Sequence, residues 1–219
     1  MRLVIDLDET LVNSVPTLAA AANVVLGELG RAPMSAEDYV AHVGWGMRAQ
    51  IKGVLEATGG VPGGDVGPYL RRMIEVYAAD PLGETRPYPG ARAALELLVE
   101  RGHALAVCTQ KPEAQAREIL ERLDLVPPIT GLTGAGTLDV LKPDPAMLHH
   151  AAGQLPGEAP VVMIGDSTVD AQTAQNAGVP FLLFAPAGRA KSADVPAQGR
   201  FAAWSELPDL VARLEAQAA

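Results

Sequence analysis

The stretch LVIDLDETLVNS, residues 3–14, decides the fold. Its three apolar residues lead directly to two carboxylates, Asp6 and Asp8, and the hydroxyl of Thr10 follows. A short apolar run bounded by polar residues is typical of a central strand in a parallel sheet. Open α/β sheets bind their ligands beyond the carboxyl ends of such strands. We therefore expect the chemistry of this protein to begin at Asp6 and Asp8.

The chain that follows divides into a helical part and an alternating part. Residues 16–84 carry helical patterns, including ones at 46–58 and 66–79, and no convincing strand. From residue 88 onward, helical patterns alternate with apolar runs, which predicts a parallel sheet with helices on both faces. We predict an α/β core with a Rossmann-like sheet, formed by residues 1–15 and 85–219, and an inserted helical cap domain, residues 16–84.

The alternating part contains four further strand candidates and five helix candidates. The clearest strands are HALAVCT, which ends at Thr109, and APVVMIGDS, which contains Asp166. A weak strand at 129–133 and a strand at 179–184 complete a predicted sheet of five. Helices are predicted at 89–102, 112–125, 142–154, 169–178 and 205–218.

Composition excludes several classes of protein. Hydrophobic residues make up 48% of the 219 residues and charged residues 20%, as in a globular protein with a substantial core. The net charge of -9 argues against a nucleic-acid partner, because few cations are available to neutralise phosphates. The single cysteine, Cys108, cannot form an internal disulfide, which favours a reducing, cytoplasmic location. No apolar run approaches the length of a membrane span, so we expect no membrane association.

Three further loops follow predicted strands and carry residues that phosphoryl transfer needs. Thr109, in VCTQK, offers a hydroxyl at a predicted helix start, although in isolation an ordinary helix cap is the favoured explanation. Lys142, in LKPDP, is held ahead of two prolines, but a solvated surface lysine has the same pattern. Asp166 and Asp170, in GDSTVD, follow an apolar strand, and either Asp166 or Ser167 suits a helix cap.

These four segments together resemble the four motifs of the haloacid dehalogenase (HAD) superfamily, over residues 1–14 and 85–190. The commoner form of the first motif reads DLDGTLVDS, from which Glu9 and Asn13 depart here. Glu9 adds a negative charge beside the site and could disturb the loop geometry or the metal preference. The resemblance implies an Mg²⁺-dependent phosphatase that forms an aspartyl-phosphate.

The resemblance also implies a role for each motif residue. Asp6 would be the nucleophile and Asp8 the general acid and base. Thr109 and Lys142 would hold the transferring oxygens. Metal ligands would be Asp6, the backbone carbonyl of Asp8 and Asp166, with Asp170 in an outer or alternative position. Thr10 and Gln110 would also contact the substrate.

Electrostatics independently favour a divalent cation. Two carboxylates 4 Å apart repel by about 4 kcal/mol at an effective dielectric constant near 20. One lysine cannot offset four such groups, whereas Mg²⁺ prefers oxygen-rich sites that leave room for a phosphate. The sequence therefore predicts that Mg²⁺ and the lysine act together with the acids.

The cap segment HVGWGMRAQIK resembles the substrate-facing loop of the phosphoglycolate phosphatase group, and ETRPYPGA resembles that group's return crossing. On this analogy Arg48 or Lys52 meets a substrate carboxylate, although both also suit solvent-facing helix positions. We expect a small phosphorylated metabolite as substrate, with 2-phosphoglycolate as the first candidate, and a monomer or homodimer.

Other functions remain open. A phosphatase or phosphomutase of sugar phosphates or nucleotides would also use Asp8. A 2-haloacid dehalogenase has no alkoxide for Asp8 to protonate, and a phosphonatase would need Lys52, the one lysine of the cap, as a Schiff base. A non-catalytic phosphometabolite-binding protein would not need acids at positions 6, 8 and 166.

Overall fold

The computed structural model describes residues 1–186 and 194–218, and the chain forms two compact units. One unit comprises Met1–Val12 and Pro87–Ala219, and the other comprises Asn13–Arg86. The boundaries that we predicted from the sequence follow residues 15 and 84. The two crossings, β2 (Val12–Asn13) and β3 (Arg86–Pro87), pair as a two-stranded sheet.

The first unit is built on a six-stranded parallel sheet, which confirms the predicted α/β class. Its strand order is β5-β4-β1-β6-β7-β8. The strands are β1 (Arg2–Ile5), β4 (Ala104–Pro112), β5 (Ile129–Ala135), β6 (Val161–Gly165), β7 (Phe181–Phe184) and β8 (Gly199–Phe201).

Strand β1 lies at the centre because its apolar residues can be covered on both faces. Leu3, Val4 and Ile5 are all fully buried. Ile5 is in register with Val107 of β4 on one side and with Ile164 of β6 on the other. From β1 the chain builds outward through β4 and β5, then returns to add β6 on the opposite side. The strand order therefore reverses next to β1, and ligand sites lie at the carboxyl ends of strands at such a point.

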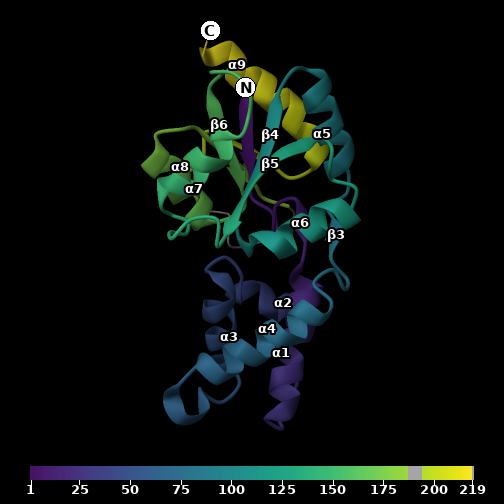
Figure 1. Ribbon diagram of the computed structural model, residues 1–219, viewed down its shortest axis with the longest axis vertical. Helices are drawn as coiled ribbons and strands as arrows, with labels where there is room; N and C mark the ends of the chain where they lie inside the picture. The colour runs from purple at the N-terminus through teal and green to yellow at the C-terminus, as the bar shows by residue number, and fades with distance from the viewer. Residues whose placement is uncertain (187–193, 219) are drawn as a thin grey trace. The chain divides into compact units, whose positions relative to one another are not determined.

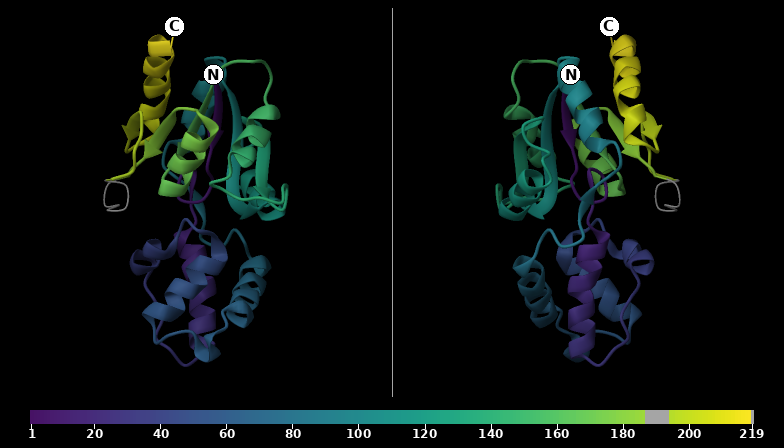
Figure 2. Two further views of the ribbon diagram at one scale, coloured as in Figure 1. Left: turned by 90° about the vertical axis from the view of Figure 1, so that its left-hand side faces the viewer. Right: turned by 90° about the vertical axis from the view of Figure 1, so that its right-hand side faces the viewer.

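Helices cover both faces of this sheet. Figure 1 shows α7 (Pro145–Gly153) and α8 (Thr168–Ala177) to the left of the sheet and α5 (Ala91–Glu100) to its right, and the two views of Figure 2 agree. Helix α9 (Leu207–Ala218) packs on α5, and α6 (Glu113–Arg122) contacts β4 and β5. The sheet is thus buried between two helical layers.

The second unit is helical. It contains α1 (Val15–Glu28), α2 (Ala36–Tyr39), α3 (Gly46–Ala57) and α4 (Gly67–Ala79), with short 3₁₀ turns at Val40–His42 and Pro62–Gly64. Helices α3 and α4 confirm those predicted at 46–58 and 66–79. Its apolar core includes Leu26, Ile51, Leu55 and Met73, all fully buried.

Two elements of the core differ from the prediction. Strand β8 was not predicted, because its three residues, Gly199–Phe201, are too few to show a period-2 pattern. Strand β4 runs to Pro112 and does not end at Thr109, while the helix predicted at 112–125 spans Glu113–Arg122. Thr109 therefore does not lie at a helix start.

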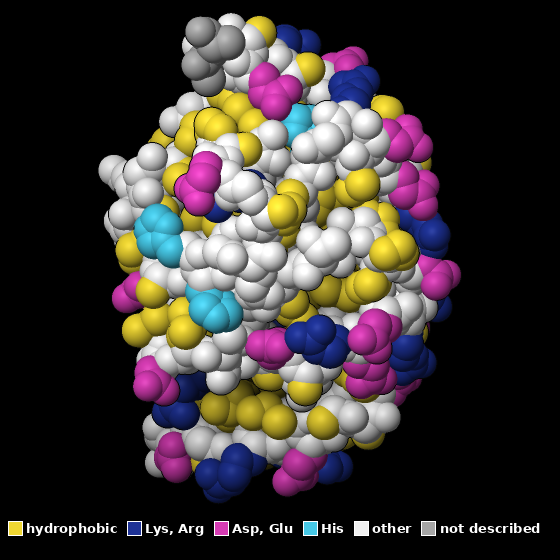
Figure 3. Space-filling model, turned by 45° about the horizontal axis from the view of Figure 1, so that its top comes forward, with side chains coloured by type: hydrophobic (Ala, Val, Ile, Leu, Met, Phe, Trp, Pro, Cys, Tyr) yellow, Lys and Arg dark blue, Asp and Glu magenta, His cyan; other side chains and the backbone are white. Residues whose placement is uncertain are grey.

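The surface mixes charges of both signs. On the face drawn in Figure 3, Lys and Arg side chains lie beside Asp and Glu side chains. Several of the charged side chains of the molecule form ion pairs one helical turn apart, as in Arg92–Glu96 and Arg122–Glu118. None of the helices in the described part of the chain is long and apolar enough to cross a membrane.

Candidate active site

Acidic side chains from two adjacent strand ends meet in the first unit. Asp6 directly follows β1, and its backbone N–H donates to the carbonyl of Ile164 in β6. Asp166 directly follows β6, and Asp170 lies in the first turn of α8. One carboxylate oxygen from each of the three lies within 4.8 Å of those of the other two. The structure therefore brings together acids from opposite ends of the sequence.

Lys142 is the cation of this cluster. Its Nζ donates to Asp6 Oδ1 at 2.7 Å and to Asp170 Oδ1 at 2.6 Å, and its side chain is only 3% exposed. The alternative interpretation of Lys142 as a solvated surface lysine is therefore wrong. It precedes α7, which begins at Pro145 and is capped by Asp144, whose carboxylate accepts the N–H of Ala146.

Asp170 has two structural partners. Its Oδ1 accepts Lys142, while its Oδ2 accepts the N–H and hydroxyl of Ser167 in a capping box. The helix-cap interpretation, with Ser167 as the cap, is thus confirmed. The same carboxylate nevertheless also belongs to the acid cluster.

Burial and mutual repulsion shift the acidity of the cluster. Burial raises the pKa of Asp6 to about 7, against the opposing effect of Lys142 and with a further contribution from Asp170. Burial, Asp170 and Asp6 hold the pKa of Asp166 well above its usual range. Burial would lower the pKa of Lys142, but Asp170 and Asp6 raise it, so this lysine stays charged. If all three acids were ionised, they would therefore carry more negative charge than one ammonium can balance.

This donor set fits a small, hard divalent cation. Carboxylate oxygens are the ligands that Mg²⁺ prefers, and Asp6, Asp166 and Asp170 supply them from within a few ångströms of one another. A cation of charge two would remove the repulsion that raises the two aspartate pKa values.

In the metal-free protein we expect the Tm to fall as the pH rises from about 5 to about 8. Asp6 ionises at about 7 in the fold, but near 4 in an unfolded chain. A carboxyl with a raised pKa stabilises the fold below that pKa and loses this contribution as the pH rises through it. Mg²⁺ should restore the Tm at the higher pH. Thermal unfolding followed by circular dichroism, with and without Mg²⁺, measures both effects.

The matched variant for this test is Asp166→Asn, which removes one repelling carboxylate. We expect the Tm of the metal-free variant to depend less on pH than that of the wild type and to respond less to Mg²⁺. A wild-type Tm that rises from about pH 5 to about pH 8 and does not change when Mg²⁺ is added would contradict the predicted metal site.

Asp8 pairs with a lysine that the sequence motifs did not single out. Lys111 Nζ lies 3.0 Å from Asp8 Oδ1, and this ion pair lacks the alignment of a hydrogen bond. The side chain of Lys111 is 3% exposed and that of Asp8 is 20% exposed. Lys111 lies two residues after Thr109, and alternate residues of an extended strand share a face. This alternation in VCTQK could have placed Lys111 on the same face as Thr109. The prediction for this segment used only Thr109 and Gln110.

Thr109 is buried near this lysine. Its Oγ1 accepts the backbone N–H of Lys111 at 3.1 Å, in a part of β4 where the pairing with β5 shifts register between Cys108 and Pro112. Gln110 between them is half-buried. Both predicted residues thus lie at the carboxyl end of β4, beside the end of β1.

The loop after β1 is anchored on both sides. The hydroxyl of Thr10 donates to Asp166 Oδ1 at 3.2 Å, and its carbonyl accepts the indole N–H of Trp204. Glu9 is fully buried in a left-handed backbone conformation, with φ 67°. Its carboxylate accepts the hydroxyl of Tyr88 at 2.9 Å. A non-glycine residue there costs about 1–2 kcal/mol, which explains why glycine is the commoner residue of the motif.

The predicted cap residues lie on α3 of the second unit. Arg48 is exposed there. Lys52 is exposed and lies 3.6 Å from Glu56, one turn further along the helix. The positions of Arg48 and Lys52 therefore both match the solvent-facing interpretation, as far as their own helix is concerned.

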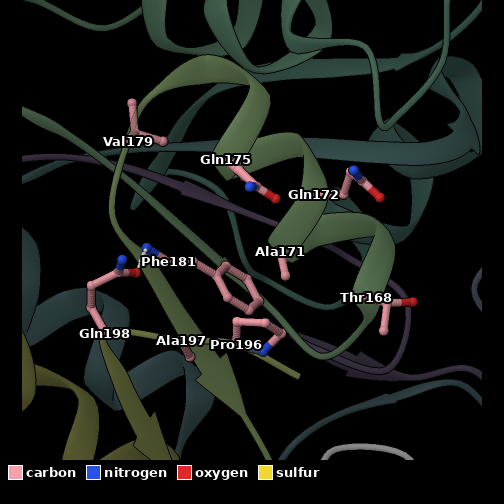
Figure 4. A pocket seen from close by; sticks show the side chains of 9 residues that line it. All are labelled: Thr168, Ala171, Gln172, Gln175, Val179, Phe181, Pro196, Ala197 and Gln198. Carbon is pink, nitrogen blue, oxygen red and sulfur yellow. Dashed lines mark hydrogen bonds between the residues drawn. The ribbon is translucent and has the colours of Figure 1, made fainter. Parts of the chain in front are cut away.

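A separate pocket of about 570 Å³ lies between α8, β7 and residues 196–198. Figure 4 shows Gln172, Gln175 and Gln198 around the ring of Phe181, whose backbone N–H donates to the Gln198 amide oxygen. The described residues that line it are all neutral. The acid cluster with its lysines is therefore the better candidate for binding a phosphate ester.

Comparisons with known proteins give a family match and relatives that align over most of this chain. Residues 3–184 match the model of a family described as haloacid dehalogenase-like hydrolase. A phosphoglycolate phosphatase from Cereibacter sphaeroides (strain ATCC 17025 / ATH 2.4.3) is 42% identical over 214 residues, which cover 97% of this chain and 98% of the relative. A phosphoglycolate phosphatase from Rhodospirillum rubrum is 40% identical over 187 residues, covering 83% and 78%.

Solved structures share the fold. A predicted phosphoglycolate phosphatase from Haemophilus somnus superposes with a TM-score of 0.82 at 22% identity, over 96% of this chain and 97% of that one. CbbY from Rhodobacter sphaeroides, solved in complex with phosphate, gives a TM-score of 0.71 at 19% identity, over 94% and 95%.

Proposed function

Because this chain belongs to the haloacid dehalogenase-like hydrolase family and is a phosphoric monoester hydrolase, we propose that it hydrolyses 2-phosphoglycolate with Mg²⁺ through an aspartyl-phosphate on Asp6. The family resemblance inferred from the motifs is confirmed by the family match. The substrate is proposed from the relatives, several of which are named phosphoglycolate phosphatase and align over nearly the whole chain.

The observation that carries the proposal is the position of Asp6. Its carboxylate contacts Lys142, and one of its oxygens lies within 4.8 Å of an oxygen of Asp166 and of Asp170. A carboxylate attacks an anionic phosphate only when nearby cations mask the negative charge of both groups. Lys142 supplies one positive charge, with its Nζ 2.7 Å from Asp6 Oδ1. A metal bound by the neighbouring carboxylates would supply the other.

The proposed reaction has two displacements. An oxygen of Asp6 bonds to phosphorus as the bond from phosphorus to the alkoxide breaks, and Asp8 gives its proton to the departing alkoxide. Asp8 then takes a proton from water, whose oxygen attacks phosphorus and releases phosphate from Asp6. Thr109 and Lys142 hold the transferring oxygens during both steps.

The metal would be held by Asp6, Asp166 and the backbone carbonyl of Asp8, with Asp170 close by. When bound, it supplies positive charge to the transferring phosphoryl group. The size of the barrier supports this division of work, because general acid catalysis contributes only about 10²- to 10⁴-fold. Phosphate monoester hydrolysis is accelerated by up to about 10²¹-fold in enzymes.

Residues 16–84 are proposed to act as a cap domain that selects the substrate. Within it, Arg48 is the proposed contact for a substrate carboxylate, since its guanidinium can bind a carboxylate through two N–H groups. Its side chain on α3 is exposed, which leaves it accessible to a ligand.

A colorimetric phosphate-release assay tests the proposal. With Mg²⁺ present we expect 2-phosphoglycolate to be hydrolysed faster than sugar phosphates, nucleoside monophosphates and p-nitrophenyl phosphate. Chelation should abolish the release and added Mg²⁺ should restore it. If another ester is preferred, the substrate proposal fails while the phosphatase class stands. If phosphate release is undiminished after chelation, the proposed requirement for Mg²⁺ is instead overturned.

A further inference from the structure

Lys111 is a buried cation that the proposed mechanism does not use. Lys142 faces Asp6 and Asp170, where phosphorus would be attacked, whereas Lys111 faces Asp8 at 3.0 Å. The two lysines thus contact different carboxylates of the same site. Each buried ammonium is paired with a carboxylate, as burial of a charge requires, but only Lys142 has a role in the proposed reaction.

The position of Lys111 is fixed by its own strand. Its backbone N–H donates to Thr109 Oγ1, and both side chains are buried at the carboxyl end of β4. The ammonium therefore belongs to a buried residue of a strand and not to a flexible lysine side chain on the surface. Rigid placement is what a specificity contact requires, because little side-chain entropy is lost when a ligand binds.

Asp8 is the more open member of this pair. Its side chain is 20% exposed, against 9% for Asp6 and 1% for Asp170. In the proposed reaction the leaving oxygen lies at Asp8. Any group carried a short distance beyond that oxygen therefore comes close to the Lys111 ammonium.

We propose that Lys111 is a specificity-determining residue whose ammonium binds an anionic group on the leaving alcohol, so that the enzyme favours phosphate esters of small hydroxy acids. This inference rests on the proposed function, since it takes Asp8 as the group facing the leaving oxygen. In 2-phosphoglycolate the carboxylate is separated from that oxygen by one methylene group. An ammonium has three N–H donors and can contact Asp8 and a substrate carboxylate together.

The chemistry divides the site into two halves. Lys142 serves the transferring phosphoryl group through Asp6, and Lys111 serves the leaving group through its contact with Asp8. A neutral leaving alcohol would offer Lys111 no negative charge to contact. The core unit then contributes to selectivity for a hydroxy-acid ester, in addition to the contact proposed for Arg48.

The test compares two substrates of similar size, 2-phosphoglycolate and 2-hydroxyethyl phosphate, which replaces the carboxylate with a neutral alcohol. We expect Lys111→Met to reduce the ratio of kcat/KM for the acid over the alcohol by about 10- to 100-fold, the range of a hydrogen bond to a charged group. Lys111→Arg keeps the charge and should retain part of the ratio. Arg48→Met is the comparison variant for the cap.

The outcomes separate this inference from the proposed function. If Lys111→Met slows both substrates by the same factor, Lys111 only positions Asp8 and the inference is overturned, while 2-phosphoglycolate hydrolysis stands. If only Arg48→Met loses the ratio, the carboxylate is bound by the cap and the inference is again overturned. A wild type that does not prefer 2-phosphoglycolate to the neutral ester overturns this inference and the proposed substrate, while the phosphatase class stands.

A binding measurement covers the case in which Lys111→Met is too slow to assay. In an Asp6→Asn background, calorimetry gives the Kd of both esters in the presence of Mg²⁺ without turnover. Adding Lys111→Met should weaken binding of 2-phosphoglycolate by about 10-fold or more and weaken the neutral ester less. Equal weakening of both esters overturns the inference.

Discussion

Asp6→Asn is expected to lower kcat for phosphate release by at least about 10⁴-fold, because an amide is not a nucleophile for phosphorus and no covalent intermediate can form. The carboxylate of Asp6 lies between Lys142 and the other acids of the cluster. Its replacement is nearly isosteric, so the loss would report on chemistry and not on packing. The measurement is the rate at saturating substrate and Mg²⁺.

Stability distinguishes this result from unfolding. Asp6→Asn removes a carboxylate whose charged form is disfavoured by burial and by Asp170, so the metal-free variant should be at least as stable as the wild type near pH 8. The matched control is Asp209→Asn, which makes the same chemical change at an exposed position. The control should retain full activity. Activity of Asp6→Asn within about tenfold of the wild type would remove Asp6 as the nucleophile.

The sheet could be predicted where the apolar pattern is strong. The runs before Asp6 and Asp166 are short, apolar and bounded by polar residues, and both are central strands flanked on each side. Strand β8 has three residues, one of them Gly199, and lies at the edge of the sheet. Its pairing with β7 is decided by tertiary contacts, which no local pattern records.

The site could be predicted only in outline. Parallel strands end at the same edge of a sheet, so residues that follow neighbouring strands must converge, as Asp6 and Asp166 do. Which acid each lysine contacts depends on side-chain geometry, and the pairing of Lys111 with Asp8 was therefore missed. The sequence also could not show that Asp170 completes the capping box of α8 with Ser167 and binds Lys142 at once.

Glu9 illustrates a further limit. From the sequence, a glutamate in place of glycine next to Asp8 indicates an added negative charge beside the site. In the structure its carboxylate is buried and accepts the Tyr88 hydroxyl. The acid cluster consists of Asp6, Asp166 and Asp170 within the described residues. Backbone conformation, here a positive φ, decided where this side chain points.

Lys142→Met is expected to have the largest effect on stability, because it leaves two buried carboxylates without their ammonium. Breaking a buried ion pair by removing one partner costs about 3–5 kcal/mol in the free energy of unfolding. Loss of the cation also raises the pKa of Asp6 further, so the nucleophile is protonated at neutral pH. We expect kcat/KM to fall by at least about 100-fold and the rising limb of the pH–rate profile to move to higher pH.

The pH dependence of stability gives this prediction its sharpest test. Below the raised pKa values Asp6 is neutral and needs the lysine less, so the destabilisation should be smaller near pH 5 than near pH 8. Asp170→Asn, added to Lys142→Met, should recover part of the loss at the higher pH by removing one unbalanced charge. Lys52→Met is the matched control, because its partner Glu56 is 3.6 Å away and both side chains are more than half exposed. Exposed pairs contribute about 0–1 kcal/mol. Urea unfolding measures the free energy of unfolding of both lysine variants. The same small loss in both would mean that Lys142 does not balance the acid cluster.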